Sequence, residues 1–197
     1  MFPRFYPVVP DAAWVGRLAS VGVKLIQLRI KDAPADSIRP AISEALKISR
    51  THGCELVVND YWQEALDCGA SFIHLGQGDL QTADTAAIRH AGVKLGISTH
   101  SHEELDIALQ EDPDYVALGP IYETKLKAMP WAPQGLDRIK EWKALAKRPL
   151  VAIGGITLER APLVFAAGAD SIAVVTDVVA HPSPEQRAHD WLKLISQ

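Results

Sequence analysis

Residues 24–59 read KLIQLRIKDAPADSIRPAISEALKISRTHGCELVVN. The two ends of this stretch, Lys24 to Arg29 and Glu55 to Asn59, are short apolar runs with the length and composition of β-strands. Between them lies a longer segment whose buried-type residues follow helical spacing at Ile38, Ile42, Leu46 and Ser49. The stretch therefore predicts a strand, a helix and a second strand.

Two residue types set the predicted limits of the helices. We place Pro40 in the first turn of its helix, where a missing amide hydrogen matters little. Several helical segments end in a glycine before the next strand, and glycine is the usual left-handed stop of a helix. These glycines are Gly22, Gly53, Gly69, Gly92 and Gly168.

The same alternation runs along the whole chain and gives eight strand candidates. They are Arg4 to Val9, Lys24 to Arg29, Glu55 to Asn59, Phe72 to Leu75, Val93 to Ser98, Tyr115 to Gly119, Leu150 to Gly154 and Ser171 to Val175. Eight strand–helix units predict an α/β protein, a single-domain (β/α)8 TIM barrel over residues 1–197. The alternative is an open doubly wound sheet, but Pro10-Asp11-Ala12 stands where that fold has its glycine-rich turn.

Composition narrows the class of protein. The chain has 197 residues, 48% of them hydrophobic and 22% charged, and a formal net charge of -4, so nothing favours a nucleic-acid partner. No apolar run has membrane-spanning length, and the start of the chain does not read as a secretory signal. Cys54 and Cys68 lack metal-binding spacing and are expected to be reduced thiols. We therefore predict a cytoplasmic protein without a membrane partner, and the sequence leaves the oligomeric state open, a homo-oligomer included.

Gln27, Arg29 and Lys31 occupy alternating positions at the end of the second predicted strand. Alternate residues of a strand share one face, so an amide and two cations lie side by side. Arginine grips an oxyanion through two hydrogen bonds and lysine adds a point charge. The triplet therefore predicts a phosphate or pyrophosphate ligand, against the alternative of an ordinary solvated strand end.

Polar residues also end the other predicted strands. In a barrel of this kind the chemistry gathers at the carboxyl ends of the strands, so these residues are expected to meet at one mouth. They are Asn59-Asp60, His74 with Gln77 and Asp79, Ser98-Thr99-His100, Thr124 with Lys125 and Lys127, Gly154-Gly155, and Val175-Thr176.

Two features of this mouth predict how it binds a phosphorylated small molecule. Asp60 and Asp79 are candidate ligands of Mg2+, which takes one or two carboxylates and completes its shell with water and phosphate oxygens. Each is also compatible with a helix cap or a turn. Gly154-Gly155 is expected to open the start of a helix to an anion, against the alternative of a tight turn.

Other residues are assigned more ordinary roles. A zinc site built from His74, His100 and His102 is the less favoured alternative, because His102 is predicted to start a helix. The segment from Tyr122 to Gly135 is long for a tight barrel and is predicted to be a lid. Trp14, Trp142 and Trp191 are expected to pack in the core.

Seven motifs, taken in order, resemble those of the thiamine phosphate synthase family. They are Gln27-Leu28-Arg29-Ile30-Lys31, Asn59-Asp60, His74-Leu75-Gly76-Gln77-Gly78-Asp79, Gly96-Ile97-Ser98-Thr99-His100, Gly119-Pro120-Ile121-Tyr122 with Thr124 and Lys127, Ala152-Ile153-Gly154-Gly155-Ile156, and Gly168-Ala169-Asp170. The resemblance covers the second to the eighth strand, which is most of the chain.

The resemblance implies a Mg2+-dependent transferase that joins hydroxymethylpyrimidine pyrophosphate to a thiazole phosphate and releases pyrophosphate. It implies three groups of site residues in this chain. The pyrimidine and its pyrophosphate would contact Gln27, Arg29, Lys31, Asn59, Ser98 and Lys127, with Arg29, Lys31 and Lys127 assisting departure of the pyrophosphate by charge. Mg2+ would be held by Asp60 and Asp79, and the thiazole phosphate by Thr124, Gly155, Val175 and Thr176.

The chain departs from the family pattern at Ile30, Tyr61 and Leu126, and the change at Leu126 is expected to weaken the grip on the thiazole phosphate. Two alternatives therefore stay open. One is an isomerase like the related thiazole tautomerases, although Pro120 stands where their catalytic histidine is expected. The other is a noncatalytic relative that binds a phosphorylated ligand.

Overall fold

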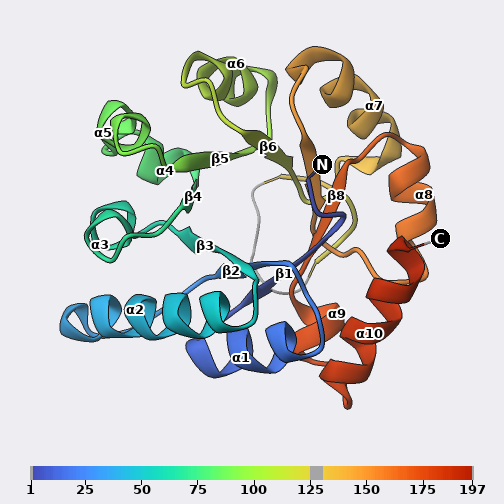
Figure 1. Ribbon diagram of the computed structural model, residues 1–197. Coiled ribbons are helices and arrows are strands. Elements are labelled where there is room, and N and C mark those ends of the chain that lie inside the picture. The colour runs from blue at the N-terminus through green and yellow to red at the C-terminus, as the bar shows by residue number, and fades with distance from the viewer. Residues whose placement is uncertain (1, 125–130, 197) are drawn as a thin grey trace.

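In the computed structural model, which describes residues 2–124 and 131–196, eight parallel strands close into a barrel (Figure 1). Each strand pairs with the next one in the chain, and β8 pairs with β1 to close the ring. The strands are β1 (Phe5–Val9), β2 (Leu25–Leu28), β3 (Glu55–Asn59), β4 (Phe72–Leu75), β5 (Lys94–Thr99), β6 (Tyr115–Leu118), β7 (Leu150–Ile153) and β8 (Ser171–Val174). The predicted barrel is confirmed, each strand to within one residue at its ends, and the open sheet is wrong.

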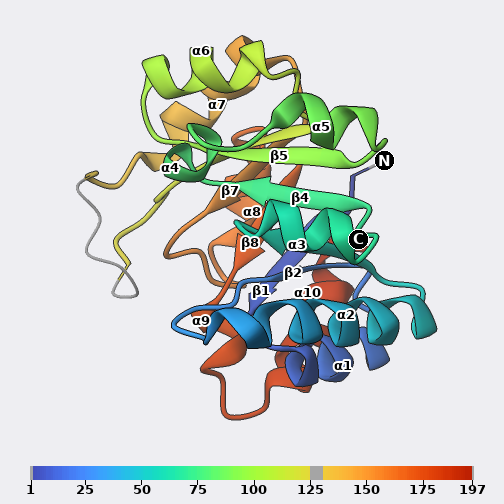
Figure 2. The same cartoon turned by 90° about the vertical axis from the view of Figure 1, so that its left-hand side faces the viewer.

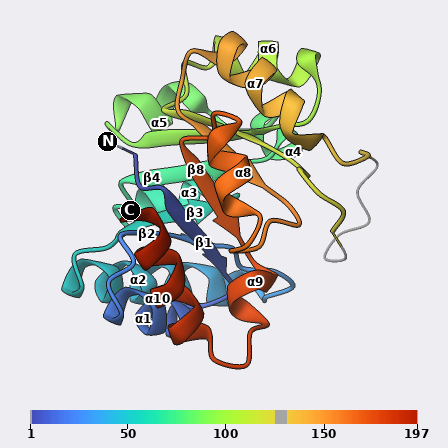
Figure 3. The same cartoon turned by 90° about the vertical axis from the view of Figure 1, so that its right-hand side faces the viewer.

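Helices surround this barrel and connect its strands (Figures 1 and 2). They are α1 (Ala12–Ser20), α2 (Ala35–Thr51), α3 (Trp62–Asp67), α4 (Gln77–Leu80), α5 (Thr85–His90), α6 (His102–Gln110), α7 (Gly135–Ala146), α8 (Ala161–Ala166), α9 (Thr176–Val179) and α10 (Pro184–Ile195). The views from two opposite sides place the short helices α4 and α9 at the same end of the barrel (Figures 2 and 3). None of the helices in the described ranges combines the length and the apolar character needed to cross a bilayer.

Strand alternation divides the buried side chains into two sets. In β2, Ile26 and Leu28 belong to the large core between the strands and the helices, whereas Leu25 belongs to a smaller cluster inside the barrel. Gln27 shares the inward face with Leu25 because side chains alternate along a strand. Trp142 and Trp191 are fully buried in the large core, and Trp14 packs against it, so the three predicted core tryptophans are confirmed.

The helix limits were predicted in part. The five stop glycines have φ between 60° and 110°, which confirms the left-handed helix ends. Pro40 is not in the first turn, because α2 begins at Ala35 behind Pro34 and carries the proline in its second turn. The residues after Gly154-Gly155 do not start a helix either, since α8 begins only at Ala161.

Candidate functional site

The carboxyl ends of the strands bring polar side chains into the barrel mouth. Gln27, Asn59 and His74 are buried, with 6%, 5% and 5% of their surface exposed, and Ser98 is partly buried at the end of β5. The β3–β4 register sets Asn59 directly beside His74. The polar strand ends were predicted to meet at one mouth because parallel strands of a closed barrel all end on the same side. The structure has this parallel, closed topology.

A row of hydrogen bonds crosses the inside of the barrel below this mouth. Nε2 of Gln27 donates to the hydroxyl of Tyr6 (2.9 Å), which lies 2.9 Å from the hydroxyl of Tyr115. The Tyr115 hydroxyl lies 2.6 Å from Nδ1 of His74, and Nε2 of His74 lies 2.8 Å from Oγ of Ser98. Sequence reasoning missed Tyr6 and Tyr115, although both lie within predicted strands.

Burial, and to a lesser extent the positive charge of Arg29, lower the pKa of His74 to about 3. The imidazole is therefore neutral at physiological pH. The other two histidines of the zinc alternative are engaged elsewhere: His100 with Glu104 and His102 with Glu141, each at 2.7 Å. Within residues 2–124 and 131–196, no group of three or more His, Cys, Asp or Glu side chains is arranged to hold a metal ion.

Asp60 and Asp79 come together at the mouth. Asp60 follows β3 with a left-handed φ of 68°, and Asp79 lies in α4. The pKa of Asp60 is raised to about 6, first by burial and then by the charge of Asp79 and a hydrogen bond with it, whereas Arg29 and a hydrogen bond from Asn59 act in the opposite direction. Two neighbouring carboxylates, one of which is disfavoured in its charged form, are a fitting donor set for Mg2+, because a bound cation offsets their mutual repulsion.

Arg29 therefore acts electrostatically on both Asp60 and His74, which places its guanidinium near the carboxylate pair. Lys31 is exposed beyond the end of β2, and its role stays a prediction. Thr124 is partly buried at the end of the described range. Lys125, Leu126 and Lys127 lie outside the described residues, so the predicted contacts of Lys127 stay predictions as well.

The glycine pair after β7 has a different local role from the one predicted. Gly154 and Gly155 have φ of 99° and 64°, and a Cβ at Gly155 would lie 2.4 Å from the carbonyl oxygen of Glu123. The carbonyl of Gly154 accepts a hydrogen bond from the amide of Tyr122 (3.0 Å). The pair thus lets the loop after β7 pack against the loop after β6, which carries Thr124.

Replacing Gly155 with alanine is expected to lower the free energy of unfolding by about 2–5 kcal/mol, because it adds backbone strain to an overlap with the main chain at Glu123. Gly53→Ala is the matched control: Gly53 also has a left-handed φ, but no atom lies within 4 Å of its added Cβ. We expect that variant to lose only about 1 kcal/mol. Urea unfolding of both measures the difference, and equal losses would contradict the packing role of Gly155.

Val175 and Thr176 stand at the corresponding point after β8. Val175 precedes α9 and packs against the cluster inside the barrel, and Thr176 is the first residue of that helix. Both therefore lie at the carboxyl end of the strand that neighbours β7, where the thiazole phosphate was predicted.

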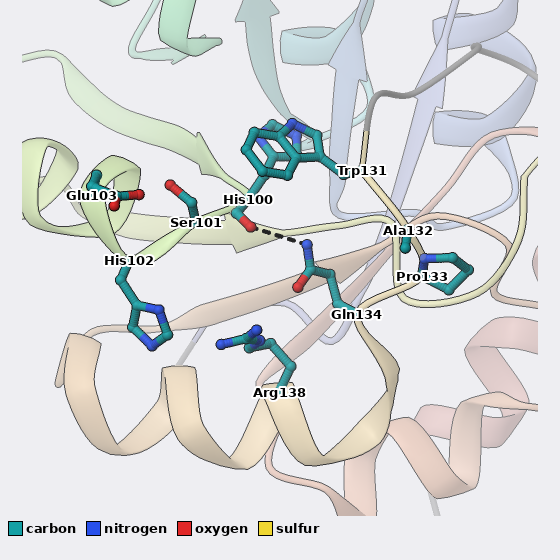
Figure 4. Close-up of a pocket in the computed structure, with 9 residues that line it drawn as sticks. All are labelled: His100, Ser101, His102, Glu103, Trp131, Ala132, Pro133, Gln134 and Arg138. Atoms are coloured by element: carbon teal, nitrogen blue, oxygen red, sulfur yellow. Dashed lines mark hydrogen bonds between the residues drawn. The ribbon is translucent and has the colours of Figure 1, made fainter.

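A pocket of about 330 Å3 lies beside the mouth, between the start of α6 and the segment before α7 (Figure 4). Trp131 stacks on His100 with ring centroids 5.9 Å apart, and Gln134 donates to the carbonyl of His100 (3.0 Å). These contacts fix the end of the predicted Tyr122 to Gly135 lid. The lid itself falls in part on residues 125–130, outside the described residues.

Comparisons with known proteins agree over nearly the whole chain. Residues 6–178 match the family model described as thiamine monophosphate synthase. The thiamine-phosphate synthase of Rhizobium etli is 56% identical over 189 residues, covering 95% of this chain and 93% of the relative, and that of Enterobacter sp. (strain 638) is 46% identical over 94% of this chain and 85% of the relative. Among solved structures, a thiamine phosphate pyrophosphorylase from Pyrococcus furiosus superposes with a TM-score of 0.86 at 26% identity, covering 98% of this chain and 95% of the other.

Proposed function

The chain belongs to the thiamine monophosphate synthase family, and we propose that it is the transferase that joins hydroxymethylpyrimidine diphosphate to a thiazole phosphate. In this reaction the carbon–oxygen bond to the diphosphate breaks, and the ring nitrogen of the thiazole supplies the electron pair of the new carbon–nitrogen bond. The products are thiamine phosphate and inorganic diphosphate.

One observation supports this proposal above the others. The carboxyl groups of Asp60 and Asp79 lie close enough to form a hydrogen bond, and the positive charge of Arg29 acts on Asp60. A departing diphosphate gains negative charge, so a site that stabilises it needs cations fixed in advance. Arg29 supplies one, and the two carboxylates supply a place for a second. A mouth built only to bind a phosphate monoester has no need of a half-buried carboxylate pair.

We assign the site residues from the family motifs and, for the described ones, from their place around the mouth. Gln27, Asn59 and Ser98 hold the pyrimidine at the buried end, and Arg29 and Lys31 face the diphosphate. Lys127, which lies outside the described residues, is assigned to the diphosphate from the family motif alone. The thiazole phosphate is held by Thr124, Gly155, Val175 and Thr176. Asp60 and Asp79 would hold Mg2+, which when bound would supply positive charge to the leaving diphosphate.

No general base is required for the attack in this proposal, because the thiazole nitrogen carries no hydrogen when it reacts. This fits the interior of the mouth, where His74 is neutral and has both ring nitrogens in hydrogen bonds. The protein then contributes mainly orientation and charge.

The test is to incubate the purified protein with both substrates, with and without Mg2+, and to follow thiamine phosphate. We expect product only when the metal is present. If no product forms while a thiazole carboxylate phosphate is isomerised, the tautomerase-like function replaces this one. Binding of a thiazole phosphate without either reaction would indicate the noncatalytic relative.

The proposal also includes a cytoplasmic location and one domain over residues 1–197. Support for the location comes from the two cysteines, both free thiols. Burial raises the pKa of the Cys54 thiol to about 12, so that residue is an unreactive part of the core.

A further inference from the structure

The row of Gln27, Tyr6, Tyr115, His74 and Ser98, here called the interior row, joins five different strands. Its middle members are packed tightly: Tyr6 and Tyr115 are 1% and 0% exposed, and the His74 ring stacks on Tyr115 at 5.5 Å. Gly96 makes the room for this arrangement, since a Cβ there would lie 2.1 Å from the Tyr115 ring. The row is therefore held by the barrel core as well as by its own hydrogen bonds.

One end of the interior row sets the direction of its hydrogen bonds. The Nε2 atom of Gln27 donates and cannot accept, so the Tyr6 hydrogen has to go to the oxygen of Tyr115. If instead Tyr115 donated to Tyr6, the buried Tyr6 hydrogen would have no acceptor in the row, and buried polar groups are almost always paired. The Tyr115 hydrogen is then left for Nδ1 of His74.

The same logic fixes the other end. Because Nδ1 of His74 accepts from Tyr115, the single hydrogen of the neutral imidazole sits on Nε2 and is donated to Oγ of Ser98. Ser98 is thus an acceptor within the row, and its own hydroxyl hydrogen is left for a further partner. Ser98 is the member of the row that is only partly buried at the mouth.

We propose that the interior row makes Ser98 an obligatory hydrogen-bond donor to the substrate, so that the site selects an aromatic ring that presents an acceptor, such as an unprotonated ring nitrogen. Tyr6, Tyr115 and His74 are positioning residues in this scheme, because they act on the substrate through Ser98. The identity of the ring rests on the proposed function, which places the pyrimidine there. The direction of the row does not depend on it.

The first test reads the row directly in the free protein. Nitrogen NMR of histidine-labelled protein at pH 7.5, with His74 assigned from the His74→Gln variant, is expected to show a neutral ring with its hydrogen on Nε2 and a bare, hydrogen-bonded Nδ1. A hydrogen on Nδ1, or a doubly protonated ring, would overturn the proposal. The other six histidines of the chain serve as internal references.

The second test asks whether Tyr115 acts through Ser98. Binding of hydroxymethylpyrimidine diphosphate is measured by calorimetry, with Mg2+ present, for Tyr115→Phe, Ser98→Ala and the double variant. We expect Tyr115→Phe to weaken binding about 5- to 10-fold in the wild-type background, which is the effect of losing one neutral hydrogen bond. In the Ser98→Ala background we expect the same substitution to weaken binding less than about 2-fold. An equal loss in both backgrounds would overturn the proposal.

Thr99→Val is the matched control for losing a buried hydroxyl. Thr99 is fully buried, donates to the carbonyl of Ala117 and accepts from Trp142, but it lies outside the interior row. We expect its affinity for the diphosphate to stay within about 2-fold of wild type. If Tyr115→Phe fails to fold, Tyr6→Phe breaks the same row one step earlier and is expected to show the same dependence on Ser98.

The two proposals fail in different ways. A wild-type protein that does not bind the pyrimidine diphosphate would overturn both the proposed function and the ligand named for Ser98. The NMR experiment needs no ligand, so it would still decide the direction of the interior row.

Discussion

Arg29→Ala is expected to lower kcat about 100- to 1000-fold and to leave the KM for the thiazole phosphate within about 2-fold. The reason is that Arg29 acts on the carboxylate pair where the diphosphate is proposed to leave, so its charge matters most as negative charge develops. The thiazole phosphate is assigned to the other side of the mouth, after β7 and β8. Steady-state kinetics with each substrate varied in turn measures both quantities.

Arg29→Lys is the control for charge alone. Lysine keeps the positive charge but lacks the planar fork of two donors, so we expect it to recover part of the rate and not all of it. A loss of thiazole phosphate affinity as large as the loss of kcat would contradict the role assigned to Arg29.

The fold could be predicted from sequence because its signals are local and repeated. Short apolar runs such as Leu25–Leu28 and Phe72–Leu75, separated by segments of helical spacing, leave few arrangements for a parallel sheet. A closed ring of eight parallel strands accommodates all eight runs in their sequence order. The helix start that was predicted wrongly, with Pro40 in the first turn, depends on a cap at Pro34 that has no side-chain hydrogen bond and so no sequence signal.

The residues of the candidate site also fall into those that local sequence signals predict and those that they miss. Asp60 and Asp79 were predicted because polar residues after buried strands are conspicuous, and a parallel barrel gathers strand ends at one mouth. Tyr6 and Tyr115 were missed because a buried tyrosine in a strand is equally typical of a core. Their function depends on a hydrogen bond between residues 109 positions apart, and no local pattern reports that pairing.

The glycine pair shows a third case. Its location at the mouth was predicted, but its proposed structural cause was wrong, because no helix starts there. The requirement for glycine comes from the neighbouring loop: a Cβ at Gly154 would lie 2.6 Å from the main chain of Pro120. A contact between two loops from different strands is a tertiary property, so the sequence shows the glycines without showing what they touch.

Asp60→Asn is expected to abolish Mg2+-dependent activity, with a loss of at least about 100-fold in kcat, and at the same time to make the protein more stable. The two effects have one cause. Burial and the neighbouring charge of Asp79 disfavour the ionised carboxylate, and this cost is what a bound cation would remove. Asparagine keeps the shape and tolerates the left-handed φ of 68° at this position.

The pH dependence follows from the direction of the shift. Because the pKa of Asp60 is raised from 3.8 to about 6 in the folded protein, the native state between these values holds a proton that the unfolded chain has released. The free energy of unfolding therefore falls as pH rises through this window, and the cost is complete above about pH 6. Without metal, Asp60→Asn is expected to be about 1–2 kcal/mol more stable than wild type at pH 7.5 and no more stable at pH 3.5. This range is below the full value of the shift because the carboxyl is partly exposed.

Urea unfolding at the two pH values, each with and without Mg2+, measures these effects. Wild type is expected to gain stability from Mg2+ at pH 7.5, whereas Asp60→Asn is not, because it lacks the second carboxylate. Asp106→Asn is the control, since Asp106 is an exposed aspartate of α6 and its loss is expected to change neither stability nor activity appreciably. If Asp60→Asn were less stable than wild type at pH 7.5 in the absence of metal, Asp60 would be a structural residue that the fold needs in its charged form. The carboxylate pair would then not be held ready for a cation.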